Sequence, residues 1–87
     1  MTQGQNESLP VEVIDRLRRI EGQVRGLQKM MKQRRAPSEV IYQIAAVKSA
    51  LEQAAVQYLW WEAQQRGTMD NVAHEVHTAL QLIAKIL

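Results

Sequence analysis

The chain has 87 residues, with neither cysteine nor phenylalanine, and its 11 basic and 9 acidic side chains leave a formal net charge of +2. This length allows one domain at most, and a core with so few aromatic residues is typical of a helical bundle. The absence of cysteine excludes disulfides, thiolate metal sites and thiol catalysis within this chain. The small basic excess argues against a general polyanion-binding tail, so any contact with nucleic acid must come from local clustering of charge.

Residues 1–8 (MTQGQNES) are polar, and we expect a disordered tail there. They lack the basic start and apolar run of a signal peptide. No apolar stretch of the chain approaches the roughly 20 residues of a membrane span. We therefore expect a soluble, cytoplasmic protein with no membrane partner.

The first predicted helix covers about residues 10–33 and begins at Pro10, because proline is tolerated in the first turn of a helix. Its apolar side chains recur in alternating steps of four and three, and they form one stripe: Val13, Leu17, Ile20, Val24, Leu27 and Met31. At about 100° per residue, the opposite side carries a basic stripe, which consists of Arg18, Arg25, Lys29 and Lys32. Such a stripe is most often a solvated face, but repeated in an oligomer it can neutralise phosphates.

Gly22 and Gly26 lie inside this predicted helix, at the boundary of the basic stripe. Each glycine disfavours a helix by about 1 kcal/mol relative to alanine. Such residues make sense where another backbone or a ligand must approach closely.

The second predicted helix covers residues 38–66, with Ser38 as its N-cap and Gly67 as the residue that ends it. Its apolar residues follow a 3.5-residue period, and a second apolar set covers another side, so the helix needs more than one neighbour. Because so small a chain offers few neighbours, we expect other copies of the chain to complete its core.

The third predicted helix covers about residues 70–86, and we expect Thr68 or Asp70 to cap it. Short connections make the three helices antiparallel neighbours. The sequence therefore predicts one all-α domain over residues 1–87, built as a three-helix antiparallel protomer.

Few side chains in this chain carry the chemistry of a site. His74 and His77 are three residues apart and could ligate a metal together with Glu62, but two exposed histidines on a helix are usually surface residues. We see no nucleophile–base pair, no glycine-rich phosphate loop and no carboxylate pair. The sequence therefore predicts that the protein is not an enzyme.

The segments RLRRIEGQVRGLQKM (16–30) and VIYQIAAVKSALEQAA (40–55) closely resemble the CsoR/RcnR family of small all-helical bacterial repressors. Members of this family sense copper(I), nickel or cobalt, or formaldehyde, and the specific motif is R-x-x-R-x-x-G-Q-x-x-G. The resemblance implies a four-helix-bundle dimer that pairs into a dimer-of-dimers homotetramer and binds operator DNA. It implies DNA-binding roles for basic and polar residues of the first helix, to which the basic stripe adds two: Arg16, Arg19, Gln23 and Arg25, then Arg18 and Lys29.

The sensing site is where the sequence departs from the family. In its copper sensors, a cysteine precedes the second helix, and a histidine and a cysteine near the far end join it across the dimer interface. An alignment without gaps places these ligands at Pro37, Glu62 and Arg66. Copper(I) prefers thiolates, and formaldehyde sensing in the family also uses the cysteine that Pro37 replaces, so neither effector fits. Arg66 opposes a bound cation and could instead pair with Glu62.

Three interpretations of the switch follow from this replacement. Glu62 and Arg66, with the neighbouring Trp61, could form a pocket for a small molecule. His74 or His77 with Glu62 could bind nickel, cobalt or zinc, or the protein could bind DNA constitutively or with a related subunit. The competing hypothesis for the whole chain is a helical oligomer that meets other proteins without specific DNA binding.

Overall fold

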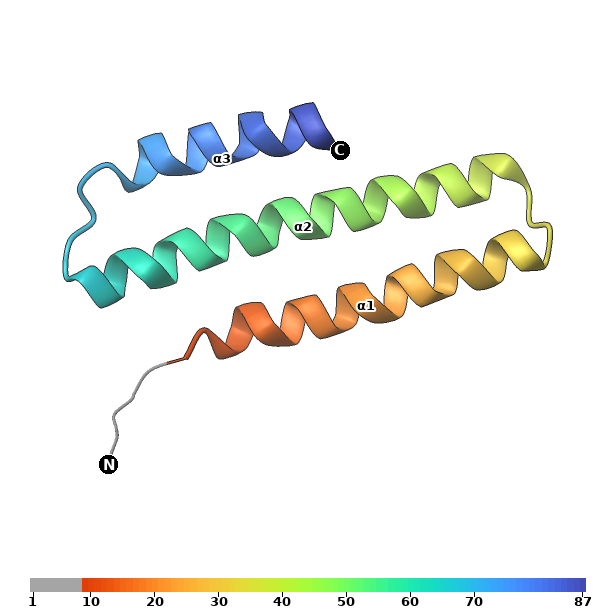
Figure 1. Cartoon of the computed structure of the whole chain (residues 1–87), viewed down its shortest axis with the longest axis horizontal. Helices are drawn as coiled ribbons and strands as arrows, with labels where there is room; N and C mark the ends of the chain where they lie inside the picture. Colours follow the sequence, from red (N-terminus) through yellow and green to blue (C-terminus); the bar gives the residue numbers. More distant parts are fainter. Residues whose placement is uncertain (1–8) are drawn as a thin grey trace.

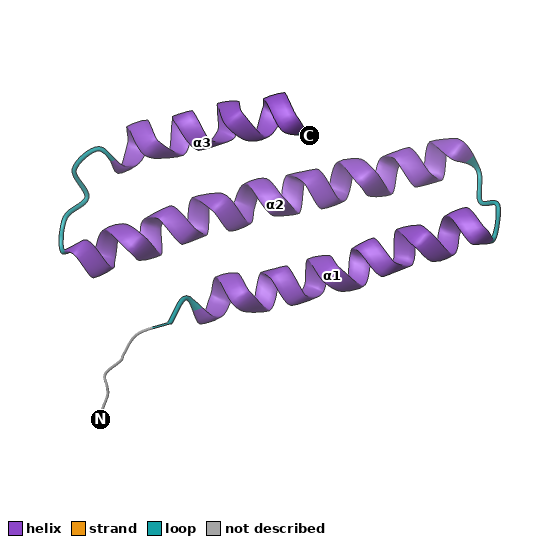
Figure 2. Ribbon diagram, in the orientation of Figure 1, coloured by secondary structure: helices purple, strands orange, loops and turns teal. Residues whose placement is uncertain are grey.

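The computed structural model describes residues 9–87, which form three α-helices: α1 (Val11–Lys32), α2 (Pro37–Arg66) and α3 (Val72–Ile86). The described residues contain no strand (Figure 2), so the predicted all-α fold class is confirmed. Successive helices run antiparallel (Figure 1). Each helix begins and ends within two residues of its expected bounds. The expected tail at residues 1–8 lies outside the described part of the chain.

The three helices form a single layer with α2 in the middle. α2 contacts α1 along one side and α3 along the other (Figure 1). The Cα atoms extend over 49 × 32 × 14 Å, so the layer is much thinner than it is long or wide. No element within residues 9–87 therefore covers either broad face of the layer.

The core of the chain uses only part of the apolar stripe on α1. Ile20 and Leu27 pack with Val47 of α2 in the main buried cluster. Val13, two helical turns before Ile20, is also buried. The alternate members of the stripe remain exposed, by 42% for Leu17, 38% for Val24 and 54% for Met31. Residues seven apart thus face α2, while those between them are turned about 40–60° to one side of this contact.

The start of α2 differs from the expectation, because Ser38 is not its N-cap. The helix begins at Pro37, and the capping position is Ala36, which makes no side-chain hydrogen bond. Proline suits the first helical position because the N–H that it lacks has no partner within the helix. Arg35 donates from Nε and Nη2 to the two Glu39 oxygens at 3.1 and 3.2 Å, and these hydrogen bonds lower the pKa of Glu39.

The connection from α2 to α3 confirms Gly67 as the helix end but corrects the expected cap of α3. Gly67 has φ 80°, and its N–H donates to the Ala63 carbonyl at 3.1 Å. α3 follows Asn71, a left-handed residue with φ 67°, and has no side-chain cap. The Thr68 hydroxyl instead accepts a hydrogen bond from the Asp70 N–H at 3.0 Å, because both residues lie in the turn before the helix.

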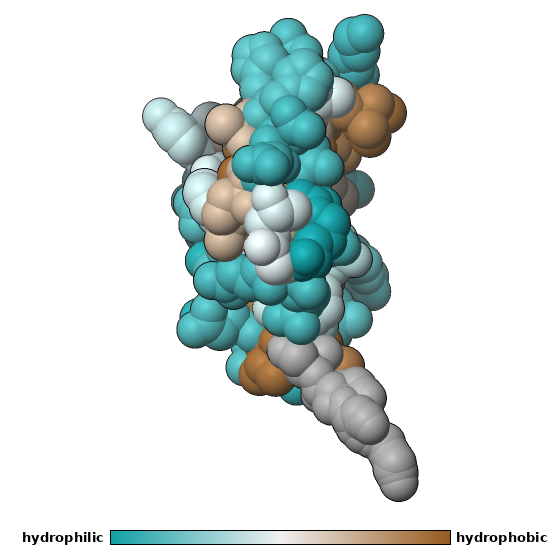
Figure 3. All heavy atoms as spheres, turned by 90° about the vertical axis from the view of Figure 1, so that its left-hand side faces the viewer, coloured by the Kyte–Doolittle hydropathy of each residue, from teal (hydrophilic) through white to brown (hydrophobic). Residues whose placement is uncertain are grey.

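Figure 3 shows the end of the layer where α2 finishes and α3 begins. Most of this end is hydrophilic, and hydrophobic residues gather in a few places at its margins. None of the helices in the described residues is long and apolar enough to cross a membrane.

Candidate functional site

The expected DNA-binding residues fall on two sides of α1. At about 100° per residue, Gln23 lies within about 20° of Arg16 and Arg19 within about 60°. Arg18, Arg25 and Lys29 lie roughly 140–180° from Arg16 around the helix, on the outer edge of the layer. The structure therefore separates the proposed contacts into a group on one broad face and a group on the edge of α1.

Most of these basic side chains are free to meet a partner. Arg19, Arg25 and Lys29 are exposed, and none forms an ion pair with another residue in the range 9–87. Arg18 pairs with Asp15 at 3.3 Å, and both of these side chains are mostly exposed. Exposed pairs of this kind contribute little and exchange readily for a phosphate.

Arg16 differs from the other basic residues because α2 holds it. Its Nε donates to Gln57 Oε1 at 2.8 Å, and its Nη1 donates to Gln53 Oε1 at 2.9 Å. These two glutamines were not among the residues singled out from the sequence. Their spacing of four on a helix places them on one side and was the available signal.

The three positions that replace the family's ligands do not meet within one protomer. Pro37 begins α2, whereas Glu62 and Arg66 lie in its last two turns. At 1.5 Å per residue, Pro37 and Glu62 are about 37 Å apart along the helix. They can come together only between two copies of α2 that run antiparallel.

Glu62 and Arg66 form an ion pair, as expected, and Glu75 of α3 joins it. Arg66 Nη1 donates to Glu62 Oε1, and Arg66 Nη2 donates to Glu75 Oε1 at 3.3 Å. A guanidinium thus occupies the space between two carboxylates that a bound cation would need. The residues here do not fit a metal ion, because the only charged ligands are already engaged by Arg66.

The histidines add no ligand set. His74 and His77 are both exposed on α3. Among residues 9–87, no group of three or more His, Cys, Asp or Glu side chains is placed to hold a metal ion.

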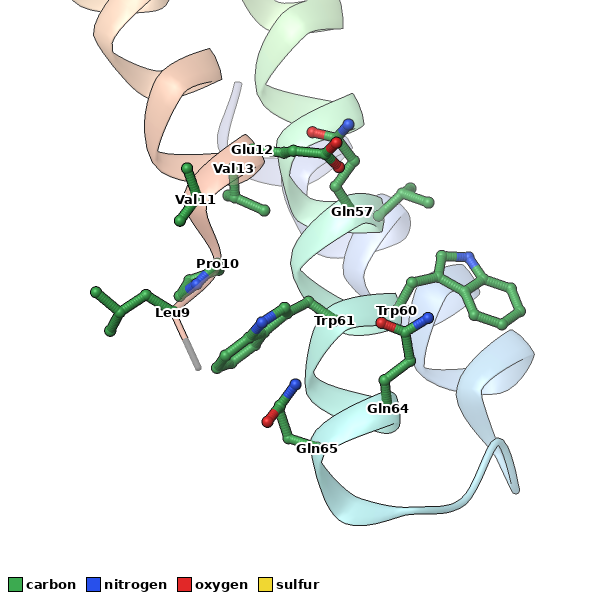
Figure 4. Close-up of a pocket in the computed structure, with 11 residues that line it drawn as sticks. Leu9, Pro10, Val11, Glu12, Val13, Gln57, Trp60, Trp61, Gln64 and Gln65 are labelled. Atoms are coloured by element: carbon green, nitrogen blue, oxygen red, sulfur yellow. The ribbon is translucent and has the colours of Figure 1, made fainter. Parts of the chain in front are cut away.

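A cleft of about 470 Å³ lies between the start of α1 and the last turns of α2. Figure 4 shows the Trp61 ring turned toward Pro10 and Leu9, while Trp60 points away from α1. Tyr58 stacks on Trp61 with ring centroids 5.9 Å apart. Trp61 lines this cleft without Glu62 or Arg66, the pair with which it could have formed a pocket.

Comparison with known proteins gives a family match over nearly all of the chain. The model of the family described as metal-sensitive transcriptional repressor matches residues 11–86. The copper-sensing transcriptional repressor CsoR of Bacillus subtilis (strain 168) is 42% identical over 48 residues, which are 55% of this chain and 48% of that protein. The copper-sensing transcriptional repressor RicR of Mycobacterium tuberculosis (strain ATCC 25618 / H37Rv) is 48% identical over 44 residues, which are 51% of this chain and 46% of that protein. The matches to these curated relatives thus span about half of their length.

Among solved structures, the nickel-responsive transcriptional regulator InrS is similar over the whole layer. The likeness has a TM-score of 0.58 at 31% sequence identity. It covers 94% of this chain and 99% of that chain.

Proposed function

The chain belongs to the metal-sensitive transcriptional repressor family, and we propose that it is a DNA-binding repressor whose effector is not copper(I). The observation that carries this proposal is the set of exposed basic residues on α1, in a chain that matches this family. Arg19, Arg25 and Lys29 form no ion pair in the described residues and are therefore available to phosphates. No helix of the layer is set out as a groove-reading helix-turn-helix, so phosphate contacts would dominate the affinity.

The proposed assembly is a dimer of dimers. Arg16 and Gln53 mark one broad face of the layer, and Ile44 and Glu62 each lie about 180° from Gln53 around α2. Beside Glu62, this opposite face carries open apolar side chains, since Ile44 is 42% exposed and Tyr58 46% exposed. An antiparallel copy on this face would cover these side chains and set the Pro37 end of one chain beside the Glu62 end of the other.

We exclude copper(I) as the effector, because copper(I) requires soft ligands and the chain has no cysteine. The two nearby carboxylates, Glu62 and Glu75, already accept hydrogen bonds from Arg66. Nickel, cobalt or zinc at the histidines has no support from the geometry, since no third ligand joins them within residues 9–87. We place a small-molecule effector in the cleft beside Trp61, where an indole and several amides line an apolar floor. Constitutive DNA binding without any effector is the other outcome that the experiments below resolve.

DNA binding is tested by fluorescence anisotropy with the protein's own promoter region, over a series of salt concentrations. We expect at least a 10³-fold preference over random DNA and a linear fall of log affinity with log salt. Replacing Arg19 and Arg25 by alanine should weaken binding to both DNAs and reduce the salt slope. Lys85→Ala, which removes an exposed charge from α3, is the matched control.

Two results would contradict the repressor proposal. One is promoter affinity no better than affinity for random DNA, and the other is binding that does not respond to salt. A tetramer that ignores DNA but captures another protein would favour the interaction-module hypothesis.

A thermal-shift screen of metals and small molecules addresses the effector. We expect no stabilisation by copper(I), and we expect any small-molecule stabilisation to disappear in Trp61→Ala but to persist in Glu62→Ala. Strong stabilisation by copper(I) would contradict the argument from the absent thiolates.

A further inference from the structure

Arg16 of α1 donates two hydrogen bonds to α2, and no other arginine in residues 9–87 makes two hydrogen bonds to another helix. Its partners Gln53 and Gln57 lie one turn apart on α2, and their amide oxygens accept from two different nitrogens of the guanidinium. A guanidinium has five N–H donors, so three remain available for a further acceptor. The hydrogen bond to Gln53 is exposed, which leaves the group open to a partner from the broad face.

The neutral partners matter because they leave the charge of Arg16 uncompensated. Arg18, Arg35 and Arg66 each donate to carboxylates. Among the arginines in residues 9–87, Arg16 alone donates two hydrogen bonds to another helix, and its acceptors carry no charge. A phosphate oxygen carries a negative charge and therefore attracts the guanidinium more strongly than a neutral amide oxygen does. Two amides can therefore fix the guanidinium without competing with a phosphate for it.

We propose that Gln53 and Gln57 are positioning residues, which pre-set Arg16 for contact with the DNA backbone. This inference rests on the proposed function. A free arginine loses rotamer freedom when it binds a phosphate, and a side chain already ordered in the unbound protein avoids most of that loss. The groove of about 430 Å³ that Arg16 lines with both glutamines spans all three helices, so the contact surface extends from α1 onto α2. Glu52 lines the same groove but forms no ion pair with Arg16.

The test is a double-mutant cycle on promoter affinity. The double variant Gln53→Leu/Gln57→Leu removes both acceptors at similar volume, and we expect its affinity to fall about 3- to 10-fold. In the Arg16→Ala background the same two changes should have no further effect, because the glutamines act through Arg16. Gln81→Leu, an exposed glutamine on α3, is the matched control and should bind like the wild type.

Further readouts separate positioning from a general structural role. The melting temperature and oligomeric state of the double variant should match those of the wild type. Gln57→Glu, which adds a competing carboxylate, should weaken binding more than Gln57→Leu and should reduce the salt slope. In the DNA-free protein, the Arg16 Nε–H should exchange with solvent more slowly than the exposed Arg25 Nε–H, and the double variant should abolish this difference.

The outcomes distinguish this inference from the function on which it rests. If the wild type shows no preference for its promoter, the repressor proposal fails. If Arg16→Ala weakens promoter binding while Gln53→Leu/Gln57→Leu binds as the wild type does, the positioning role alone is overturned. Tighter binding by the double variant would also overturn it, since the glutamines would then be withholding Arg16 from DNA. If the double variant does not fold, Gln57→Leu and the Nε–H exchange carry the same comparison.

Discussion

At the scale of single residues, Gly26 and Gly67 should respond in opposite ways to replacement by alanine. A Cβ added at Gly26 meets nothing within 4 Å, whereas Gly67 has φ 80°, a conformation that side chains disfavour. We expect Gly26→Ala to stabilise the protein by up to about 1 kcal/mol, because alanine favours a helix interior. Gly67→Ala should destabilise it by about 1–2 kcal/mol, because the left-handed end of α2 must be kept. Chemical denaturation of both variants measures the contrast.

The result at Gly26 also tests the proposed assembly. Space around Gly26 is open in the protomer, so nothing there explains a glycine inside a helix. If Gly26→Ala destabilises the protein, another backbone must approach this site in the oligomer. If it instead weakens only DNA binding, the nucleic acid makes the close approach.

Only some of the side-chain contacts in the candidate site could be predicted from the sequence. The pairing of Arg66 with Glu62 was predictable, because residues four apart meet on one helix. The hydrogen bond from Arg66 to Glu75 and those from Arg16 to the two glutamines were not predictable, because they join residues that are 9 to 41 positions apart. Such contacts depend on the relative placement of two helices, which the pattern within each helix does not fix.

At the scale of elements, the joint between α2 and α3 depends on Arg66. Replacing Arg66 by alanine removes its contacts with Glu62 and Glu75 and leaves two carboxylates facing each other. We expect a loss of about 0.5–1 kcal/mol, since these groups are partly exposed. The melting temperature should fall by roughly 2–8 °C, and added salt should narrow the gap to the wild type. If the melting temperature of Arg66→Ala equals that of the wild type at low salt, apolar packing alone must hold α3 against α2.

The elements themselves were largely predictable, whereas the caps at the starts of α2 and α3 were not. Steps of three and four fix the helical period, and glycine and proline mark the connections, so all three helices follow from local signals. The caps of α2 and α3 were wrong at Ser38 and at Thr68 or Asp70, because the helices begin after Ala36 and Asn71, and neither residue makes a side-chain cap. The choice is made by the path of the connecting turn.

α2 also joins the two candidate sites of the molecule. Gln57 lines the cleft beside Trp61 and accepts a hydrogen bond from Arg16. A ligand in the cleft that engages the Gln57 amide would compete with Arg16 for it. The central helix thus offers a short physical route from an effector to the DNA contact.

At the scale of the whole molecule, a layer one helix thick explains which apolar residues the protomer leaves uncovered. The stripe on α1 was predictable, but the burial of alternate members was not, since it depends on where α2 lies. Leu17 and Ile44, each 42% exposed, face away from the side on which Arg16 meets α2. A surface of this kind is covered by a second copy in the proposed assembly.

The last prediction concerns this uncovered face. We expect Leu17→Glu/Ile44→Glu to dissociate the protein into monomers, because association would bury carboxylates among apolar side chains. Sedimentation velocity measures the change, and promoter affinity should fall with it, since fewer basic residues then act together. Thr78→Glu, on the outer side of α3, adds a charge elsewhere and should leave the assembly intact. If the double variant keeps the wild-type mass, the copies must meet through the face that carries Arg16. The surface around Gln53 and Gln57 would then be closed to DNA.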